Sequence, residues 1–370
     1  MGRVLLIGNY GPSILDFYGA LIQRLGDLGH DVHCSTPEGG VDLQTALAER
    51  GAAFHQVALT RAGMNPLADR AYGKRLERLM RDIAPDLVLT YTAKPNIWGA
   101  FAAHRAGVRS IAMVNGLGYA FMSGGGLKQR LARIAAQRLY ARATRLNQRV
   151  IFLNPDDRDL FLSTGMVSDP GKLRMIQGNG VDMAHYVRAP LPDTPVFLMI
   201  SRLVGDKGVR EYGQASVAIK TRHKEAEFLL VGDFDANPDC ISRDELEGWI
   251  SGGLTHLGQL DDIRPAMARA SVYCLPSYRE GLPRSSLEAM AMGRMLITTD
   301  APGCRETVAP GETGLMIPPR NTDALIAAME QAIADPGLRS RMGESGYKRA
   351  SALYDVHKVN ETLIAHLELE

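Results

Sequence analysis

The chain has 370 residues, of which 45% are hydrophobic and 22% are charged, and its net charge is +1. This composition is typical of a folded globular protein and excludes disordered, collagen-like and disulfide-stapled chains. At roughly 150 residues per domain, the length predicts two domains. The four cysteines form no Cys-x-x-Cys pair and no Cys/His cluster, which argues against a zinc site and fits reduced thiols in the cytosol. The opening residues are too short an apolar run for a signal peptide, and no later run approaches a membrane span, so we expect a protein that is neither secreted nor membrane-spanning.

The small net charge hides an asymmetry between the two halves of the chain. Residues 1–190 hold 23 Lys and Arg against 15 Asp and Glu, whereas the remainder holds 19 against 26. A basic first half indicates an anionic partner, for which nucleic acid, acidic lipid and a phosphorylated substrate all qualify.

Short β-branched or Leu-rich runs alternate with longer amphipathic stretches along the chain. In the first half, strands are predicted at residues 4–7, 32–34, 86–90, 110–114 and 150–153, and helices at 17–28, 43–50, 70–83 and 98–106. After a proline-rich linker at 189–195, strands are predicted at 196–200, 228–231, 272–275 and 295–298. This alternation is typical of parallel, doubly wound α/β sheets. We therefore predict an α/β protein with one domain at 1–188, a second at 189–350, a cleft between them, and a C-terminal helix at 351–370 that packs back on the first domain.

Ten Lys and Arg lie between Asp86 and Asp156, a stretch without any acidic residue. Within this stretch residues 127–147 predict a helix, which follows the apolar, glycine-rich residues 116–126. A basic amphipathic helix beside such a loop suits contact with an anionic membrane surface. The side chains assigned to this contact are Lys128, Arg130, Arg133 and Arg138. A solvated helix is the alternative, and nucleic acid is disfavoured because the helix offers one aromatic side chain, Tyr140, and no stacking platform.

The loop at residues 201–208 carries two cations directly after a predicted strand. In open α/β sheets, ligands bind at the carboxyl ends of the strands. Arg202 and Lys207 lie on this loop, and two cations there can neutralise a diphosphate without a metal ion.

A second charged loop follows the strand at 272–275 and opens a helix near Arg284. The first backbone amides of a helix form an anion site. Glu280 precedes this helix and Glu288 lies about one turn into it, so the two carboxylates straddle the anion site. Each can hold hydroxyl groups on one side of a bound diphosphate.

Together these motifs resemble the retaining glycosyltransferases of family 4, which have the GT-B fold of two Rossmann-like domains facing across a cleft. The matching pieces are Asn-Gly-Val-Asp at 179–182, Ser-Arg-Leu-x4-Lys-Gly at 201–208, Pro-Ser-Tyr-Arg-Glu-Gly-Leu-Pro at 276–283, Glu-Ala-Met-Ala-Met-Gly at 288–293 and Pro-Gly-Cys-Arg-Glu at 302–306. In the first domain, Tyr-Thr-Ala-Lys-Pro-Asn-Ile-Trp-Gly at 91–99 and Gly-Leu-Gly-Tyr at 116–119 are similar to the branch that builds bacterial surface polysaccharides and lipid-linked glycans. The resemblance covers nearly the whole chain.

The resemblance implies a metal-independent enzyme without a cofactor that moves a sugar, with retention, from a nucleotide-diphosphate sugar, with a UDP-sugar favoured. The implied acceptor is a glycan or a polyprenyl-diphosphate-linked glycan, at the cytoplasmic face of the cell membrane. The implied catalytic residues are Arg202 and Lys207, on the donor diphosphate, and Glu280, on the transferred sugar. Glu288 is implied to hold the ribose. The other implied donor contacts are Gly11, Asn115, Ser201, Gly258, Leu260, Gly281, Leu282, Pro283 and Ser285.

The chain departs from the family pattern at Asn115, where many relatives have a histidine. Asparagine can hydrogen-bond a sugar hydroxyl but cannot act as a general base, so we assign no base. In a front-face retaining reaction the leaving phosphate oxygen can take the acceptor proton. Catalysis then depends on stabilising the departing diphosphate.

One acidic segment imitates metal sites. Asp233-Phe-Asp235 matches the Asp-x-Asp motif of the other large glycosyltransferase fold, and residues 233–239 imitate a calcium loop. However, Pro238 stands where that loop needs glycine, and Asp244 stands where it needs glutamate. We therefore predict a turn after a strand and no metal site.

Two alternative functions remain open. A nucleotide-sugar epimerase of the same fold would need acid and base carboxylates in the cleft and no lipid contact, and the basic residues 127–149 argue against it. A non-catalytic sugar-nucleotide-binding subunit would be expected to have lost some of the four charged residues named above for the donor, and all four are present.

Overall fold

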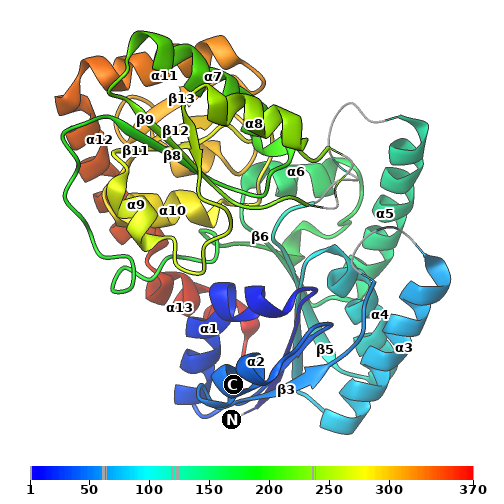
Figure 1. Cartoon of the computed structure of the whole chain (residues 1–370). Helices are drawn as coiled ribbons and strands as arrows, with labels where there is room; N and C mark the ends of the chain where they lie inside the picture. Colours follow the sequence, from blue (N-terminus) through cyan, green and yellow to red (C-terminus); the bar gives the residue numbers. More distant parts are fainter. Residues whose placement is uncertain are drawn as a thin grey trace. The chain divides into compact units, whose positions relative to one another are not determined.

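The computed structural model describes residues 2–60, 63, 65–117, 121, 126–235, 237 and 239–369, apart from the side chain of residue 128 (Figure 1). Contacts divide the chain into one unit of Met1–Asn179 with Val356–Glu370 and a second unit of Gly180–Asp355. The boundaries expected from the sequence, at 188–189 and 350–351, fall inside the second unit. Residues after 179 join this unit because the Val181 N–H donates to Tyr354 O at 2.7 Å and the Ala189 N–H donates to Met292 O at 3.3 Å.

The described part of the first unit contains a seven-stranded parallel sheet in the order β3-β2-β1-β4-β5-β6-β7. Its strands are β1 (Arg3–Ile7), β2 (Asp31–Thr36), β3 (Ala52–Gln56), β4 (Leu87–Tyr91), β5 (Arg109–Val114), β6 (Arg149–Phe152) and β7 (Leu173–Met175). Its helices are α1 (Gly11–Asp27), α2 (Val41–Ala48), α3 (Pro66–Ile83), α4 (Ala100–Ala106), α5 (Leu127–Leu146), α6 (Pro155–Ser163) and α13 (Val356–Leu367). The strand order reverses between β1 and β4, which is where open α/β sheets place ligands.

The central strands of this sheet are buried on both faces. Val4 to Ile7 of β1 are at most 1% exposed, and helix α1, which contacts the neighbouring β2, buries Ile14, Tyr18, Leu21 and Leu25. These apolar residues recur every three or four positions, so one face of the helix meets the sheet. The predicted alternation of strands and helices is confirmed here.

Helix α13 belongs to the first unit although it follows the second unit in the chain. Figure 1 shows α13, in red, beside the blue α1, and the two helices are in contact. Arg24 Nε lies 2.7 Å from Glu361 Oε1, and Arg149 Nη2 lies 2.7 Å from Glu368 Oε1. Along the described chain no helix is both long and apolar enough to cross a bilayer.

The described second unit contains a six-stranded parallel sheet in the order β10-β9-β8-β11-β12-β13. Its strands are β8 (Val196–Ile200), β9 (Glu227–Val231), β10 (Leu254–His256), β11 (Val272–Leu275), β12 (Met295–Thr299) and β13 (Gly314–Ile317). Its α-helices are α7 (Val209–Arg222), α8 (Arg243–Ser251), α9 (Arg264–Arg269), α10 (Arg284–Ala291), α11 (Thr322–Ala334) and α12 (Pro336–Arg349). The order reverses between β8 and β11, so the loops that follow these two strands flank the switch point of the sheet.

Candidate active site

The two loops at the switch point of the second unit are bonded to each other. The Tyr278 N–H donates to Asp206 O at 2.9 Å, and the Ser277 hydroxyl donates to the same oxygen at 3.2 Å. Gly208 has a φ of +76° and lies so close to the Pro276 carbonyl that a Cβ there would collide with it. Only glycine fits this backbone position. The loops that follow β8 and β11 therefore form one platform at the carboxyl ends of the strands.

Lys207 and Glu280 form an ion pair that joins the two loops. Lys207 Nζ lies 2.6 Å from Glu280 Oε1, and the two side chains are 17% and 15% exposed. Lys207 ends a short 3₁₀ turn, Gly205–Lys207, which directly precedes α7. The ammonium group has three N–H donors, so it can hold Glu280 and a ligand oxygen at the same time. The structure thus brings together two of the three residues predicted to be catalytic.

The surroundings of this pair are partly shielded from water. Burial raises the pKa of the neighbouring Asp206 carboxyl, and the positive charge of Lys207 acts in the opposite direction. Electrostatic interactions are stronger where water is excluded. A phosphate group beside Lys207 would therefore be held more firmly than at an open surface.

Arg202 lies on the same loop but pairs with a different carboxylate. Its Nη1 atom is 2.7 Å from Asp235 Oδ2, and the side chain is 58% exposed. Asp235 also accepts the Asn237 N–H, and Asp233 accepts the Phe234 N–H. These carboxylates serve a turn and an arginine, and the described residues contain no group of three His, Cys, Asp or Glu that could hold a metal ion.

Helix α10 begins beside this platform without a side-chain cap at Pro283. The first N–H bonded within the helix is that of Ser286, which donates to Pro283 O at 3.1 Å. The N–H groups of Arg284 and Ser285 precede it, and such early amides are the ones that bind anions. Glu288 is 5% exposed and lies 2.8 Å from Arg284 Nε.

Tyr273 is a residue that the sequence reasoning missed. It is fully buried in β11, and its hydroxyl donates to Ser285 Oγ at 2.6 Å and approaches Ile200 O at 3.2 Å. Burial raises the pKa of this phenol, so it remains a donor at neutral pH. Tyr273 thereby fixes Ser285 at the start of α10. The sequence did not indicate this role, because a tyrosine between two apolar residues of a strand is also what an ordinary core position shows.

Two glycines allow the remaining loops to pack closely against the platform. Gly303, with φ +80°, lies against the Glu280 carbonyl, and the Glu280 N–H donates to Pro302 O at 2.8 Å. Gly232, with φ +140°, lies against the Ser201 carbonyl, and its N–H donates to Gly258 O at 2.9 Å. A Cβ at either glycine would collide with these carbonyls. The Gly258–Leu260 loop is thus connected to the loop after β8 through Gly232, whose role the sequence reasoning also missed.

In the first unit, the predicted donor contacts lie at the carboxyl ends of β1 and β5. Gly11 is the first residue of α1, and the preceding N-cap residue, Tyr10, makes no side-chain cap. The Asn115 amide donates to the Tyr18 hydroxyl, and its Oδ1 atom is buried without a hydrogen-bond partner in the described chain. Burial raises the pKa of Tyr18. Among the described residues, the Asn115 side-chain oxygen therefore has no hydrogen-bond donor.

Helix α5 forms where the basic helix is predicted, and its outer face carries both apolar and basic side chains. Leu127, Leu131 and Ile134 are 72%, 58% and 45% exposed. They recur every three or four residues, and the exposed Arg138, Arg142 and Arg145 continue the same face. Arg130 is exposed beside them and Arg133 is half-buried. We call Leu127, Leu131, Ile134, Arg138, Arg142 and Arg145 the outer face of α5.

Some predicted contacts fall outside the described residues. They are the Lys128 side chain, Gly118 and Tyr119 of the Gly-Leu-Gly-Tyr motif, and most of the apolar stretch before α5. Phe121 is described and is 8% exposed.

Two family descriptions match most of the chain. Residues 18–178 match "Glycosyl transferase 4-like domain", and residues 194–335 match "Glycosyl transferases group 1". The segment between these matches, residues 179–193, contains most of the proline-rich linker.

Curated relatives and solved structures align over most or all of the chain. The N,N'-diacetylbacillosaminyl-diphospho-undecaprenol alpha-1,3-N-acetylgalactosaminyltransferase of Campylobacter jejuni is 27% identical, over 100% of this chain and 97% of its own. An Escherichia coli UDP-Gal:alpha-D-GlcNAc-diphosphoundecaprenol alpha-1,3-galactosyltransferase is 26% identical, over 70% and 69%. The sucrose-phosphate synthase of Thermosynechococcus elongatus superposes with a TM-score of 0.82 at 20% identity, over 99% and 98%. Anabaena HepE, solved with UDP and glucose, superposes with 0.77 at 18% identity, over 100% of both chains. These structural likenesses establish the fold.

Proposed function

Because this chain belongs to the family 4, group 1 glycosyltransferases and has the GT-B fold, we propose that it moves a sugar from a UDP-sugar to a polyprenyl-diphosphate-linked acceptor. The observation that carries the proposal is the Lys207–Glu280 pair at the switch point, beside the uncapped start of α10. A cation and the first backbone amides of a helix suit a diphosphate. A carboxylate held next to them suits sugar hydroxyls.

The relatives support the choice of donor and acceptor. HepE was solved with UDP-glucose as well as with UDP and glucose. The names of the Campylobacter and Escherichia coli relatives both contain an undecaprenyl-diphosphate-linked acceptor, and the second also names a UDP-sugar donor. A UDP-sugar and a polyprenyl-diphosphate acceptor therefore fit this chain best.

We propose that the reaction retains the anomeric configuration and needs no metal ion. The bond between the anomeric carbon and the diphosphate oxygen breaks, and the acceptor oxygen forms the new bond on the same face of the sugar. The acceptor proton passes to the leaving phosphate oxygen, since Asn115 cannot accept it. Arg202, Lys207 and the first amides of α10 stabilise the charge on the departing diphosphate.

A transfer assay with defined components tests this proposal. The protein is incubated with a panel of UDP-sugars and an undecaprenyl-diphosphate-linked sugar in excess EDTA. We expect one donor to be consumed, with product formed at an undiminished rate and with the donor's anomeric configuration by NMR. Loss of activity that Mg²⁺ or Mn²⁺ restores would contradict metal independence and return attention to Asp235. Interconversion of UDP-sugars without an acceptor would indicate the epimerase, and binding without turnover would indicate a non-catalytic subunit.

We also propose that the outer face of α5 binds the anionic surface of the membrane that carries the acceptor. Three exposed apolar side chains and three exposed arginines on one helix face combine shallow insertion with charge attraction. Each Lys or Arg near an anionic leaflet contributes about 1 kcal/mol. The protein is thus proposed to act as a peripheral protein at the cytoplasmic face.

Sedimentation with lipid vesicles tests the membrane contact. The protein is expected to sediment with anionic vesicles but not with neutral ones, and high salt should release it. Arg130→Glu/Arg138→Glu should weaken binding by at least ~30-fold, and Leu131→Ser/Ile134→Ser should also weaken it. The control Arg222→Glu/Arg269→Glu changes the net charge equally, on exposed arginines of the second unit. If the control weakens binding as much, or if neutral vesicles bind equally, α5 is not the contact.

A further inference from the structure

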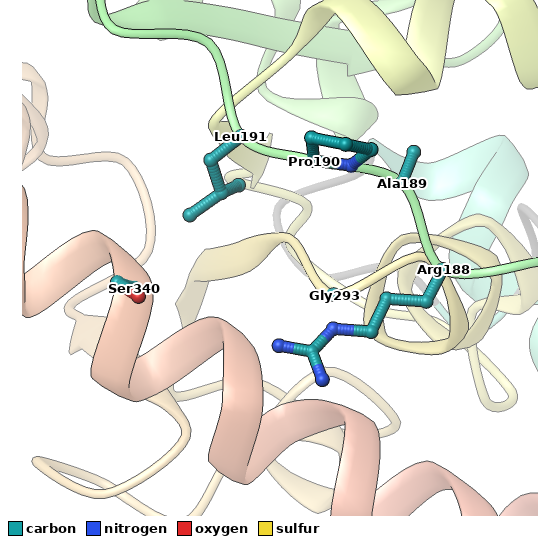
Figure 2. Close-up of a pocket in the computed structure, with 6 residues that line it drawn as sticks. All are labelled: Arg188, Ala189, Pro190, Leu191, Gly293 and Ser340. Carbon is teal, nitrogen blue, oxygen red and sulfur yellow. The ribbon is translucent and has the colours of Figure 1, made fainter.

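A cavity of about 400 Å³ lies in the second unit, away from the loops described above. It is lined by Arg188, Ala189, Pro190, Leu191, Gly293 and Ser340 (Figure 2). Residues 188–191 lead into β8, and Gly293 leads into β12, so the cavity lies toward the amino ends of these parallel strands. The donor loops follow the carboxyl ends of β8 and β11. The cavity and the donor loops are therefore at opposite edges of the same sheet.

Beside the cavity lies a buried arginine whose hydrogen bonds go to backbone carbonyls. Arg294 directly follows Gly293 and is 0% exposed. Its guanidinium donates to carbonyl oxygens that include those of Ala189, Pro190 and Ala270, the last at 2.6 Å. Burial, and then the charge of Arg188, lower the pKa of Arg294 to about 10, so it stays protonated at neutral pH. Carbonyls satisfy its N–H groups, and no carboxylate in the described part of the chain forms an ion pair with it.

A second buried arginine holds the linker further along. Arg339, which directly precedes Ser340, is 3% exposed and donates to Ala332 O at 2.6 Å and to Asp193 O at 3.3 Å. Burial lowers the pKa of Arg339, and the Asp335 carboxylate opposes this shift. Two buried cations thus fasten residues 189–193, and the cavity lies beside both. A cavity in such surroundings attracts anions.

Arg188 supplies an exposed cation at the cavity. Figure 2 shows its side chain extending from the linker into the space between Gly293 and Ser340. The side chain is 52% exposed, forms an ion pair with Glu344 and lies over the ring of Tyr347 at 5.5 Å. Lys348 Nζ is 3.4 Å from the same Glu344. Glu344 therefore retains a cationic partner if Arg188 turns to a ligand.

We propose that this cavity is a second, non-catalytic binding site for a small phosphorylated molecule of the size of a sugar phosphate. The phosphate accepts hydrogen bonds from the Arg188 guanidinium and the Ser340 hydroxyl, which are suitable donors for an oxyanion. Leu191 and Pro190 offer an apolar wall to the remainder of the ligand. The volume lies within the range of small-molecule sites. This site is independent of the transfer reaction proposed above.

Calorimetric titration tests the site directly. Glucose 6-phosphate and inorganic phosphate are the charged probes, and glucose is the neutral probe. We expect both phosphates to bind and glucose not to bind. Arg188→Gln should weaken phosphate binding by at least ~10-fold, because a charge-assisted hydrogen bond is lost. Ser340→Ala should weaken it to a lesser extent.

The chain offers a closely matched control. Arg222 is 51% exposed and pairs with Glu330, which is 36% exposed, whereas Arg188 and Glu344 are 52% and 35% exposed. Arg222→Gln should leave phosphate binding unchanged, and the binding that Arg188→Gln weakens should persist in Lys207→Ala of the donor loop. No binding of either phosphate, or equal weakening by Arg222→Gln, would overturn the proposal. Binding that is lost in Lys207→Ala and retained in Arg188→Gln would assign the phosphate to the donor loops instead.

Discussion

Lys207→Ala is expected to lower turnover by at least ~10²-fold, the usual effect of removing one donor that stabilises developing negative charge. Lys207 and Arg202 are the two cations predicted to hold the diphosphate, and Lys207 is the less exposed of them. Its Nζ atom lies 2.6 Å from Glu280 Oε1. The substitution removes the positive charge beside the leaving diphosphate, and it also removes the cation that orients Glu280. Both effects act on the departing diphosphate and the transferred sugar, so kcat should fall more than KM rises.

The same variant should also lose some stability. The sequence alone suggests a loop cation whose removal leaves the fold unchanged, but the ion pair is mostly buried. The substitution removes the cation that Glu280 contacts at 2.6 Å, and breaking a mostly buried ion pair destabilises the native state. Thermal unfolding measured beside the transfer assay separates the two effects. Arg210→Ala is the control, since Arg210 on α7 pairs with Asp239 in the loop before α8 and with Glu245 on α8. Turnover close to that of the control would refute the role of Lys207.

Arg294→Met is expected to destabilise the second unit by at least ~3 kcal/mol. The substitution removes the guanidinium donor from the carbonyls of Ala270 and Met292, whose bonds to it are buried, and from those of Ala189, Pro190 and Ala268, whose bonds to it are partly buried. Of these five, Met292 O keeps the N–H of Ala189 as a donor. Each buried polar group left unsatisfied costs about 1–3 kcal/mol, although the apolar side chain recovers part of this. For a unit of this size the melting temperature should fall by roughly 6–12 °C.

Urea and thermal unfolding measure this effect. Arg222→Met is the control, because it removes an exposed ion pair with Glu330 that should contribute less than about 1 kcal/mol. Equal stability of Arg294→Met and Arg222→Met would show that Arg294 does not fasten the linker. Since Arg294 lies in a Gly-Arg-Met run before a strand, the sequence offered no sign that this arginine is buried.

Hydrophobic periodicity was sufficient to predict the fold class and most central strands. The runs at 4–7, 196–200 and 272–275 lie in strands buried on both faces, and such strands form continuous apolar runs. The short strands β3, β7, β10 and β13 were not predicted. They lie at or next to the sheet edges, where one side needs no apolar cover and the pattern therefore weakens.

Local spacing was likewise sufficient to place the charged loops at the carboxyl ends of β8 and β11 and to assign the chain to its family, because these motifs are contiguous in sequence. Their partners are not contiguous. The fold brings distant loops together to form these contacts. Lys207 pairs with Glu280, Arg202 pairs with Asp235, and Arg294 binds carbonyls of the linker. The order of the strands and the close approach of glycines to neighbouring carbonyls determine which charges pair. Only the tertiary structure decides both, because residues far apart in the chain become neighbours only when the strands are aligned.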